Sequence, residues 1–274
     1  MTTAPANDAP APIASRQNPR YKALRKLLAD PAQSRRERRA WLEGDHLCRA
    51  FLARGGVPLQ ALVTSSAWGE PAWRALAGAA PEVTVLADDL MAGLSGLESP
   101  PRIGFVVALP AAPAIRPGMR SIVLDRLQDP GNVGSLLRSA SALGFGQVLA
   151  LQGTVALWSP KVLRAGMGAH FGLHLVEGVA VAALDALAVP LVAAHLHDAV
   201  ALDRAPLPDP LAWVFGHEGQ GVADDLAARC ALRVMIPQPG GEESFNVAAA
   251  GAICLYESAR RAIAATASGA AERA

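Results

Sequence analysis

Cysteine is scarce in this chain and aromatic residues are few. The three cysteines, Cys48, Cys230 and Cys254, lie far apart and none belongs to a CxxC pair. This scatter excludes a disulfide framework and a zinc ribbon, and it favours a reducing compartment. Aromatic residues make up only 5% of the 274 residues but hydrophobic residues make up 51%, so a sizeable core has to be built from aliphatic side chains. The length predicts a globular protein of two domains.

The sequence predicts neither a secretory leader nor a membrane span. The opening residues, MTTAPANDAPAPIAS, hold neither a basic nor an apolar segment, so we expect no secretory signal and a cytoplasmic protein. An Arg-rich, acid-poor composition over the first forty residues leaves an organellar transit peptide as the alternative. The most apolar stretch, residues 178–196, is divided by Asp185 and Pro190, which predicts a helix followed by a buried strand instead of a membrane helix.

Several common ligand-binding motifs are missing. The sequence contains no Walker A segment and no GxSxG nucleophile elbow. The glycines within residues 216–221 run in the order GxxGxG and no acidic residue is placed to bind a ribose, so they form no dinucleotide fingerprint. Two histidine pairs, His170 with His174 and His195 with His197, lack an HExxH glutamate, and we therefore expect no metal site.

The net charge is only +1, but it is unevenly distributed. Residues 15–54 carry eleven Lys and Arg against four Asp and Glu, so this segment has a charge of +7 and the remainder a charge of −6. Each cation that meets a phosphate releases a counterion, so the asymmetry favours a polyanionic partner. A solvated amphipathic helix is the alternative. The basic residues at the start of the segment are Arg16, Arg20, Lys22, Arg25 and Lys26.

Composition divides the chain into five segments. Residues 1–14 are rich in Ala and Pro and predict a disordered tail. Alternating helical and strand-like patterns over residues 15–108 predict a small α/β domain, and residues 109–119 form a Pro-rich linker. A second domain follows over residues 120–264, and residues 265–274 form a C-terminal tail.

The second domain alternates short apolar strands with helices, which is typical of a parallel sheet covered on both faces. Ligands of such sheets bind beyond the C-terminal ends of the strands. The predicted strands cover residues 121–125, 147–151, 173–176, 190–196, 212–216 and 233–237.

The exit from the first of these strands, DPGNVGSLLRSA, combines turn residues with a helix. Asn132 is predicted to be an N-cap or loop residue, and Arg138 lies about two turns inside the helix. An arginine on a helix that packs against a sheet either extends its charge into solvent or binds an anion. Taken alone, Arg138 favours the first arrangement.

Two further strand exits carry polar residues. The segment FGHEGQG places Gly216 and Glu218 after the fifth strand, where glycines let backbone groups approach a ligand closely. The segment GGEESFN places Ser244 and Asn246 at the start of a helix of small apolar residues, and capping accounts for only one of them. Because parallel strands end at one edge of the sheet, we expect a single cleft to collect these residues.

These three segments, in this order, resemble the three motifs of the SpoU/TrmH family of RNA ribose 2′-O-methyltransferases, within the SPOUT superfamily. The resemblance covers residues 120–262, and residues 16–54 are more loosely similar to the family's small N-terminal substrate-binding domain. It implies an α/β fold with a parallel-sheet SPOUT domain that contains a deep trefoil knot, an exception to the rule that chains are not knotted. The preceding domain would be a small α/β, L30e-like domain.

The resemblance also implies a cofactor, S-adenosylmethionine, and no metal. Carried onto this sequence, the cofactor-binding positions are Gly216, Ile236, Phe245 and Asn246. Phe245 stands where the family usually has Leu, which changes the expected shape of the pocket while leaving its backbone contact possible.

The family's functional positions fall on Asn132, Arg138, Glu218, Ser244 and Asn246. A guanidinium, with a pKa above about 12, is a poor base, so we interpret Arg138 as a clamp on the RNA phosphate or ribose. Asn132, Ser244 and Asn246 would hold the hydroxyl and the cleft, and Glu218 would order the loops.

The implied partners are RNA and a second copy of the chain. Arg138 and the five basic residues above are the predicted RNA contacts, with a ribosomal RNA hairpin as the expected substrate and transfer RNA as the alternative. A catalytically silent RNA-binding relative is a further alternative, although all four of Asn132, Arg138, Ser244 and Asn246 are present. The small residues of the helix after Asn246 permit close packing, and the resemblance implies that this region forms a homodimer interface.

Overall fold

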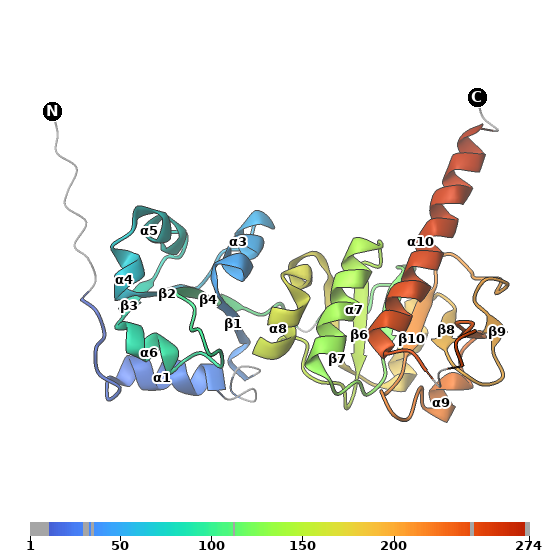
Figure 1. Cartoon of the computed structure of the whole chain (residues 1–274), viewed down its shortest axis with the longest axis horizontal. Coiled ribbons are helices and arrows are strands. Elements are labelled where there is room, and N and C mark those ends of the chain that lie inside the picture. The colour runs from blue at the N-terminus through green and yellow to red at the C-terminus, as the bar shows by residue number, and fades with distance from the viewer. Residues whose placement is uncertain (1–10, 30–32, 34–35, 112, 242–243, 272–274) are drawn as a thin grey trace. The chain divides into compact units, whose positions relative to one another are not determined.

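The computed structural model describes residues 11–29, 33, 36–111, 113–241 and 244–271, and the chain divides into two compact units (Figure 1). Unit 1 ends at Ala111 and unit 2 begins at Ala112, within the segment predicted as a linker. Of the predicted disordered tail, residues 11–14 are described, and Ile13 forms a β-bridge with Leu86. Ordered structure therefore begins before residue 15, because Ile13 packs against the core of unit 1.

Unit 1 is a mixed sheet covered by short helices. Its strand order is β1-β4-β2-β3, in which β4 is antiparallel to both neighbours and β2 is parallel to β3. The strands are β1 (Arg39–Glu43), β2 (Gln60–Thr64), β3 (Val83–Leu86) and β4 (Ile103–Ala108). The helices are α1 (Pro19–Ala29), α3 (Asp45–Ala53), α4 (Ser65–Trp68), α5 (Pro71–Ala77) and α6 (Asp88–Ala92).

Helix α1 is amphipathic, with one face committed to the core of unit 1. Tyr21, Leu24 and Leu27 are buried in a cluster with Trp41 of β1 and Leu62 of β2. Trp41 is itself buried, at 5% exposure. The basic residues of α1 lie on the other face and are exposed.

Unit 2 is built on a seven-stranded sheet in which every neighbouring pair is parallel, as predicted. The strand order is β7-β6-β5-β10-β8-β11-β9. The strands are β5 (Ser121–Leu124), β6 (Gln147–Leu151), β7 (His174–Val179), β8 (Leu191–Ala194), β9 (Val200–Ala201), β10 (Ala212–Phe215) and β11 (Leu232–Met235). The helices are α7 (Pro130–Ala142), α8 (Pro160–Gly166), α9 (Asp224–Ala227) and α10 (Val247–Ala271), with 3-10 turns η1 (Ala169–Gly172) and η2 (Val181–Leu187).

Both faces of this sheet are covered, which explains why its strands are apolar without alternation. Ile122 and Leu124 of β5 enter a core with residues of α7, α8 and α10, whereas Val123 enters a second core with residues of η2 and α9. Figure 1 shows α7, α8 and α10 along one face of the sheet. Along the described part of the chain, no helix combines the length and apolar character needed to cross a membrane.

Close helix packing on this face depends on two glycines. A Cβ at Gly134 of α7 would lie 2.3 Å from the Cβ of Ala165 in α8, and one at Gly251 of α10 would lie 2.2 Å from Leu136 Cδ2 in α7. A methyl group at Gly134 would therefore separate α7 from α8, because α8 backbone atoms lie within 2.8 Å, whereas one at Gly251 would displace the Leu136 side chain. Helix α10 continues to Ala271, beyond residue 264 where the sequence placed the end of the domain.

The strand order places a crossover point at the centre of the sheet. From β5 the chain adds β6 and β7 on one side, then returns to build β8, β10 and β11 on the other, with β10 inserted beside β5. The loops that leave β5, β10, β8 and β11 consequently emerge side by side at one edge. Ligand sites of open α/β sheets lie at such points.

His170 is buried in the core next to α8. Its side chain is 1% exposed, Nε2 lies 2.9 Å from the carbonyl of Leu157, and no described residue hydrogen-bonds Nδ1. Burial lowers the pKa of His170 from 6.5 to about 4, and the bond to the Leu157 carbonyl opposes this shift only in part. The ring is therefore neutral at pH 7.

His170 makes stability depend on pH. The unfolded chain binds a proton near pH 6.5 that the folded chain binds only near pH 4, so we expect the free energy of unfolding to fall by about 3 kcal/mol between pH 7 and pH 4 through this residue. In chemical denaturation across this range, the free energy of unfolding of His170→Gln should therefore fall by about 3 kcal/mol less than that of the wild type. His174→Gln, which alters a half-exposed histidine, serves as the control and should show the full fall. Parallel curves for the wild type and His170→Gln would contradict the assignment.

Candidate active site

The loop after β10 folds back tightly on itself. The backbone of His217 exchanges two hydrogen bonds with Gly221, at 3.0 and 2.8 Å. A Cβ at Gly216 would lie 2.1 Å from the carbonyl carbon of Gly221 and the amide nitrogen of Val222. Only glycine fits at position 216, because backbone occupies the space that any side chain would need.

Glu218 connects this loop to the exit of β5. Its carboxylate accepts hydrogen bonds from the backbone N–H groups of Gln128 (3.2 Å) and Asp129 (3.0 Å) and from Asn132 Nδ2 (3.2 Å). Partial desolvation of the carboxyl group raises its pKa, but the hydrogen bonds from Asp129, its own backbone, Asn132 and Gln128 together outweigh it and lower the pKa below 4.5. Glu218 is thus a fixed carboxylate that positions the β5 exit.

Asn132 lies in the first turn of α7. The N-cap of this helix is Asp129, whose Oδ1 accepts a hydrogen bond from the Asn132 backbone at 2.8 Å, so the prediction of Asn132 as an N-cap or loop residue is wrong. Because Asp129 satisfies the backbone, the Asn132 amide is available to other partners: Nδ2 donates to Glu218, and Oδ1 accepts from Asn246.

Asn246 caps α10 and also reaches α7. Its Oδ1 accepts hydrogen bonds from the backbone of Ala248 (2.9 Å) and Ala249 (3.3 Å), while its Nδ2 donates to Asn132 Oδ1 at 2.9 Å. Glu218, Asn132 and Asn246 therefore form a continuous hydrogen-bonded chain across three loops that are far apart in sequence. We call it the amide chain.

A cavity of about 610 Å³ adjoins the amide chain. It is lined by the segments that leave β8, β10 and β11 and by the start of α10. The predicted site residues on its wall are Gly216, Glu218, Ile236, Ser244, Phe245 and Asn246. Phe245 is 43% exposed, and Ser244 is exposed as well, so both side chains are accessible to a ligand.

Arg138 lies apart from this cavity. It is on the exposed side of α7, two turns beyond Asn132, and forms no hydrogen bond or ion pair with the residues that the structure describes. Its guanidinium is therefore directed to solvent in the isolated chain, and the geometry leaves it free to bind an anion.

The sequence did not predict Asp125 and Arg126, which brace the same loops. Asp125 is 3% exposed and accepts hydrogen bonds from Arg126 Nε (2.9 Å) and from the backbone of Ala223 (2.9 Å). Arg126 has a φ of 59° and donates to Gln220 Oε1 at 3.0 Å. A carboxylate at the end of a predicted buried strand was the available signal, since a buried charge requires such partners.

No group of three or more His, Cys, Asp or Glu side chains among the described residues is arranged to hold a metal ion. The side chains at this edge supply amides, a hydroxyl, a fixed carboxylate and imidazole rings, beside backbone groups.

The model of the SpoU rRNA Methylase family matches residues 119–256, the segment that contains the amide chain and the cavity wall. The chain belongs to this family. The family is enzymatic, and its named relatives are RNA 2′-O-methyltransferases. The resemblance stated from the three motifs is confirmed.

Two relatives extend the similarity to unit 1. The 23S rRNA (guanosine(2553)-2′-O)-methyltransferase RlmP of Bacillus subtilis is 28% identical over 218 residues, covering 78% of this chain and 86% of that protein. A Synechocystis protein, slr1673, named as an uncharacterized tRNA/rRNA methyltransferase, is 30% identical over 278 residues, covering 94% of this chain and 97% of its own.

Solved structures are similar to most of this chain. The SpoU methyltransferase AviRb from Streptomyces viridochromogenes, in complex with AdoMet, superposes with a TM-score of 0.81 at 25% identity and covers 90% of this chain and 99% of its own. An RNA 2′-O ribose methyltransferase superposes with a TM-score of 0.77 at 29% identity, covering 92% and 99% of the two chains.

The two functions of Asn246 can be separated by substitution. Asn246→Ala removes the cap and the bond to Asn132, and we expect it to destabilise the protein by about 1 kcal/mol. Asn246→Asp keeps a capping oxygen, and its charge suits a helix N-terminus, but it places a carboxylate against Asn132 Oδ1. It should therefore unfold close to the wild-type temperature and lose at least about tenfold in methyl transfer to RNA. Wild-type transfer by Asn246→Asp would contradict a role for the amide chain.

Proposed function

We propose that this protein is an S-adenosylmethionine-dependent methyltransferase that acts on the ribose 2′-hydroxyl of a structured RNA, with ribosomal RNA as the substrate. The observation that carries the proposal is the amide chain beside a cavity at the crossover point of the sheet. Transfer RNA is the second candidate, because the name of the Synechocystis relative includes both substrates.

The cavity fits the proposed methyl donor. Its volume lies within the range of about 300–1,000 Å³ typical of small-molecule sites. Glycines at 216, 219 and 221 expose backbone groups on one side, and Ile236 and Phe245 supply an apolar surface on the other. AviRb, which has the same architecture, was solved with AdoMet. When bound, S-adenosylmethionine supplies an electrophilic methyl group.

The side chains of the protein then have to align the ribose hydroxyl with the methyl group and help the hydroxyl proton to leave. Ser244 and Asn246 lie on the cavity wall, where they can hold the hydroxyl, and Asn132 fixes the Asn246 amide. Glu218 has its oxygens engaged by three donors, so in this scheme it positions Asn132 and the β5 exit and does not exchange a proton. The planar guanidinium of Arg138 binds the RNA phosphate or ribose.

Unit 1 supplies the second RNA-binding surface in this proposal. The five basic residues predicted as RNA contacts are all exposed, and none forms an ion pair with a carboxylate in the described part of the chain. The buried apolar face of α1 fixes the helix that carries most of these charges. Phosphates bound there would hold the RNA without specifying its sequence.

The homodimer is supported by an exposed apolar stripe on α10. Ile253, Tyr256 and Ile263 are 36%, 59% and 72% exposed, and their spacing places them on one side of the helix. The later turns of α10 also project beyond the sheet of unit 2 (Figure 1). A second copy of the chain would cover this stripe. The trefoil knot, the L30e-like relationship of unit 1 and the cytoplasmic location stay predictions.

Arg138→Ala tests the clamp. We expect unchanged affinity for S-adenosylhomocysteine and a loss of about 100-fold in methyl transfer, because the side chain contacts RNA and not the donor. Arg138→Lys keeps the charge but not the planar guanidinium, so its rate of methyl transfer should lie between those of the wild type and Arg138→Ala. Transfer at the wild-type rate by Arg138→Ala would rule the clamp out.

The RNA surface of α1 is tested by charge reversal, since deletion would remove Tyr21, Leu24 and Leu27 from the core. The combined substitutions K22E, R25E and K26E should weaken RNA binding. They should also make the slope of the logarithm of the binding constant against the logarithm of the salt concentration shallower by about 0.7–0.9 for each phosphate that is no longer bound. Arg74→Glu reverses another exposed charge of unit 1 and is the control. Equal salt slopes for all three proteins would return α1 to a solvated amphipathic helix.

The substrate itself is identified by mapping ribose methylation on ribosomal and transfer RNA from cells with and without the gene. A ribosomal site lost with the gene supports the proposal, and a site lost only from transfer RNA would replace it with the second candidate. Unchanged methylation in both RNA classes would contradict the proposed activity.

A further inference from the structure

One wall of the cavity is formed by residues that lie outside the three sequence motifs. The four predicted cofactor-binding residues lie on the segments that follow β10 and β11 and at the start of α10. The remaining wall consists of residues 194–197, at the end of β8, and includes His195 and His197.

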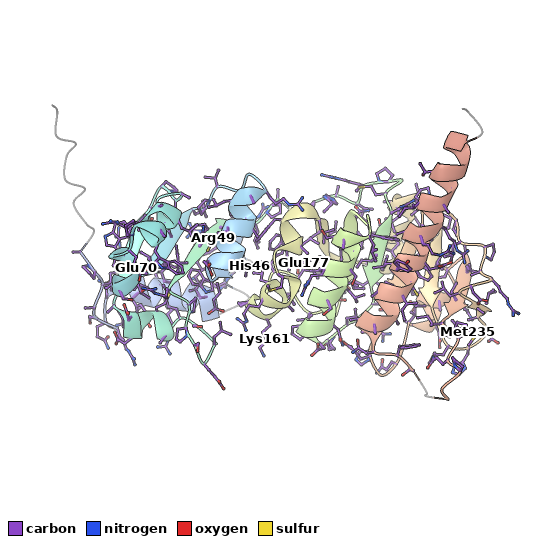
Figure 2. All side chains as sticks on the ribbon, turned by 45° about the horizontal axis from the view of Figure 1, so that its top comes forward. His46, Arg49, Glu70, Lys161, Glu177 and Met235 are labelled. Carbon is purple, nitrogen blue, oxygen red and sulfur yellow. The ribbon has the colours of Figure 1, made fainter. Side chains whose placement is uncertain are left out.

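Strand pairing places His195 between two of the predicted cofactor-binding segments. Ala193 pairs with Val214 of β10, and Ala194 pairs with Val234 of β11. Continued by one or two residues, these registers put His195 next to Gly216 on one side and Met235 on the other; Met235, labelled in Figure 2, directly precedes Ile236. The His195 N–H donates to the Val234 carbonyl at 2.9 Å, which fixes its backbone.

The His195 ring is held by its own loop. Nδ1 lies 2.8 Å from the carbonyl oxygen of His197, and the His197 backbone N–H is directed at the same nitrogen at 3.2 Å, so a neutral ring satisfies one of these two contacts. A neutral ring that carries its proton on Nδ1 donates to the carbonyl, the shorter of these contacts. Nε2 is then an acceptor, and no described residue hydrogen-bonds it.

His217, on the facing loop, has the opposite arrangement. Its Nδ1 accepts a hydrogen bond from the Gly219 backbone at 3.0 Å, so the neutral ring carries its proton on Nε2 and presents a donor. Of the two cavity histidines whose Nδ1 is engaged by backbone, only His195 therefore offers an acceptor to a ligand.

An acceptor at this point suits the adenosine half of the proposed donor, which presents the hydroxyls of its ribose and the amino group of its base. We propose that His195 Nε2 accepts a hydrogen bond from one of these groups and helps to select an adenosine-containing donor. This inference rests on the proposed function, because it assumes that S-adenosylmethionine binds in the cavity.

Calorimetric titration with S-adenosylhomocysteine tests the contact in the full chain. His195→Leu should bind about tenfold more weakly than the wild type, and His195→Gln, whose side-chain oxygen can accept, should recover part of the loss. Val200→Thr alters an exposed side chain of neighbouring β9 that does not line the cavity, and it should bind as the wild type does. Thermal unfolding of each variant checks that the fold is retained.

Analogues of the ligand identify the donor group. Three derivatives of S-adenosylhomocysteine are titrated, lacking the amino group of the base, the ribose 2′-hydroxyl or the ribose 3′-hydroxyl. One of them should bind the wild type more weakly and bind His195→Leu no more weakly than the parent ligand does, as expected when both changes remove the same hydrogen bond.

The outcomes separate this inference from the function on which it rests. Unchanged affinity of His195→Leu, or equal losses with all three analogues in both proteins, would overturn the role of His195 while S-adenosylhomocysteine still binds. Failure of the wild-type protein to bind S-adenosylhomocysteine would overturn the proposed donor as well.

Discussion

The hydrogen bond from Asn246 Nδ2 to Asn132 Oδ1 joins the start of α10 to the start of α7, 114 residues earlier in the chain. It is one of the direct ties between the third motif and the first, and Glu218 extends it to the second. Each amide has its orientation fixed by a second partner: the α10 backbone for Asn246 and the Glu218 carboxylate for Asn132. Without this tie, the three loops would share an edge of the sheet but not a defined geometry.

Hydrogen bonds of this kind contribute only about 1 kcal/mol each, so they can align loops only where the underlying elements already lie in place. Gly134 and Gly251 allow α7 to pack closely with α8 and α10. Further along α10, Arg261 donates hydrogen bonds to the carbonyls of Leu202 and Ala205 and so holds the helix against the segment after β9. The helices thus set the positions, and the amide chain sets the final orientation of the side chains.

The parallel sheet could be predicted because its strands are buried on both faces and are therefore continuous apolar runs. The six strands predicted in unit 2 are all present, and β9 was missed because two residues give no periodicity. Strand β1, residues 39–43, was also missed. It directly follows a run of arginines, and its short apolar segment gives no clear strand pattern beside them.

The candidate site was predictable only as far as its motifs reach. Asn132, Glu218 and Asn246 were identified, but the contacts among them depend on β10 lying between β5 and β8, which no local pattern encodes. For the same reason the sequence assigned no ligand role to His195: its place beside Gly216 follows from strand pairing, whereas the sequence placed it near the end of the predicted strand 190–196 without a motif beside it. The capping of α7 by Asp129 was a local feature, and the preference of Asn for the same role obscured it.

The central claim is that Asn132 and Asn246 act as one unit in assembling the site. A double-mutant cycle on methyl transfer, using Asn132→Ala, Asn246→Ala and the combined variant, measures this coupling directly. We predict that the double variant loses little more activity than either single variant, with a coupling free energy of at least about 1 kcal/mol. Fully additive losses would show that the two asparagines act independently and would contradict the account.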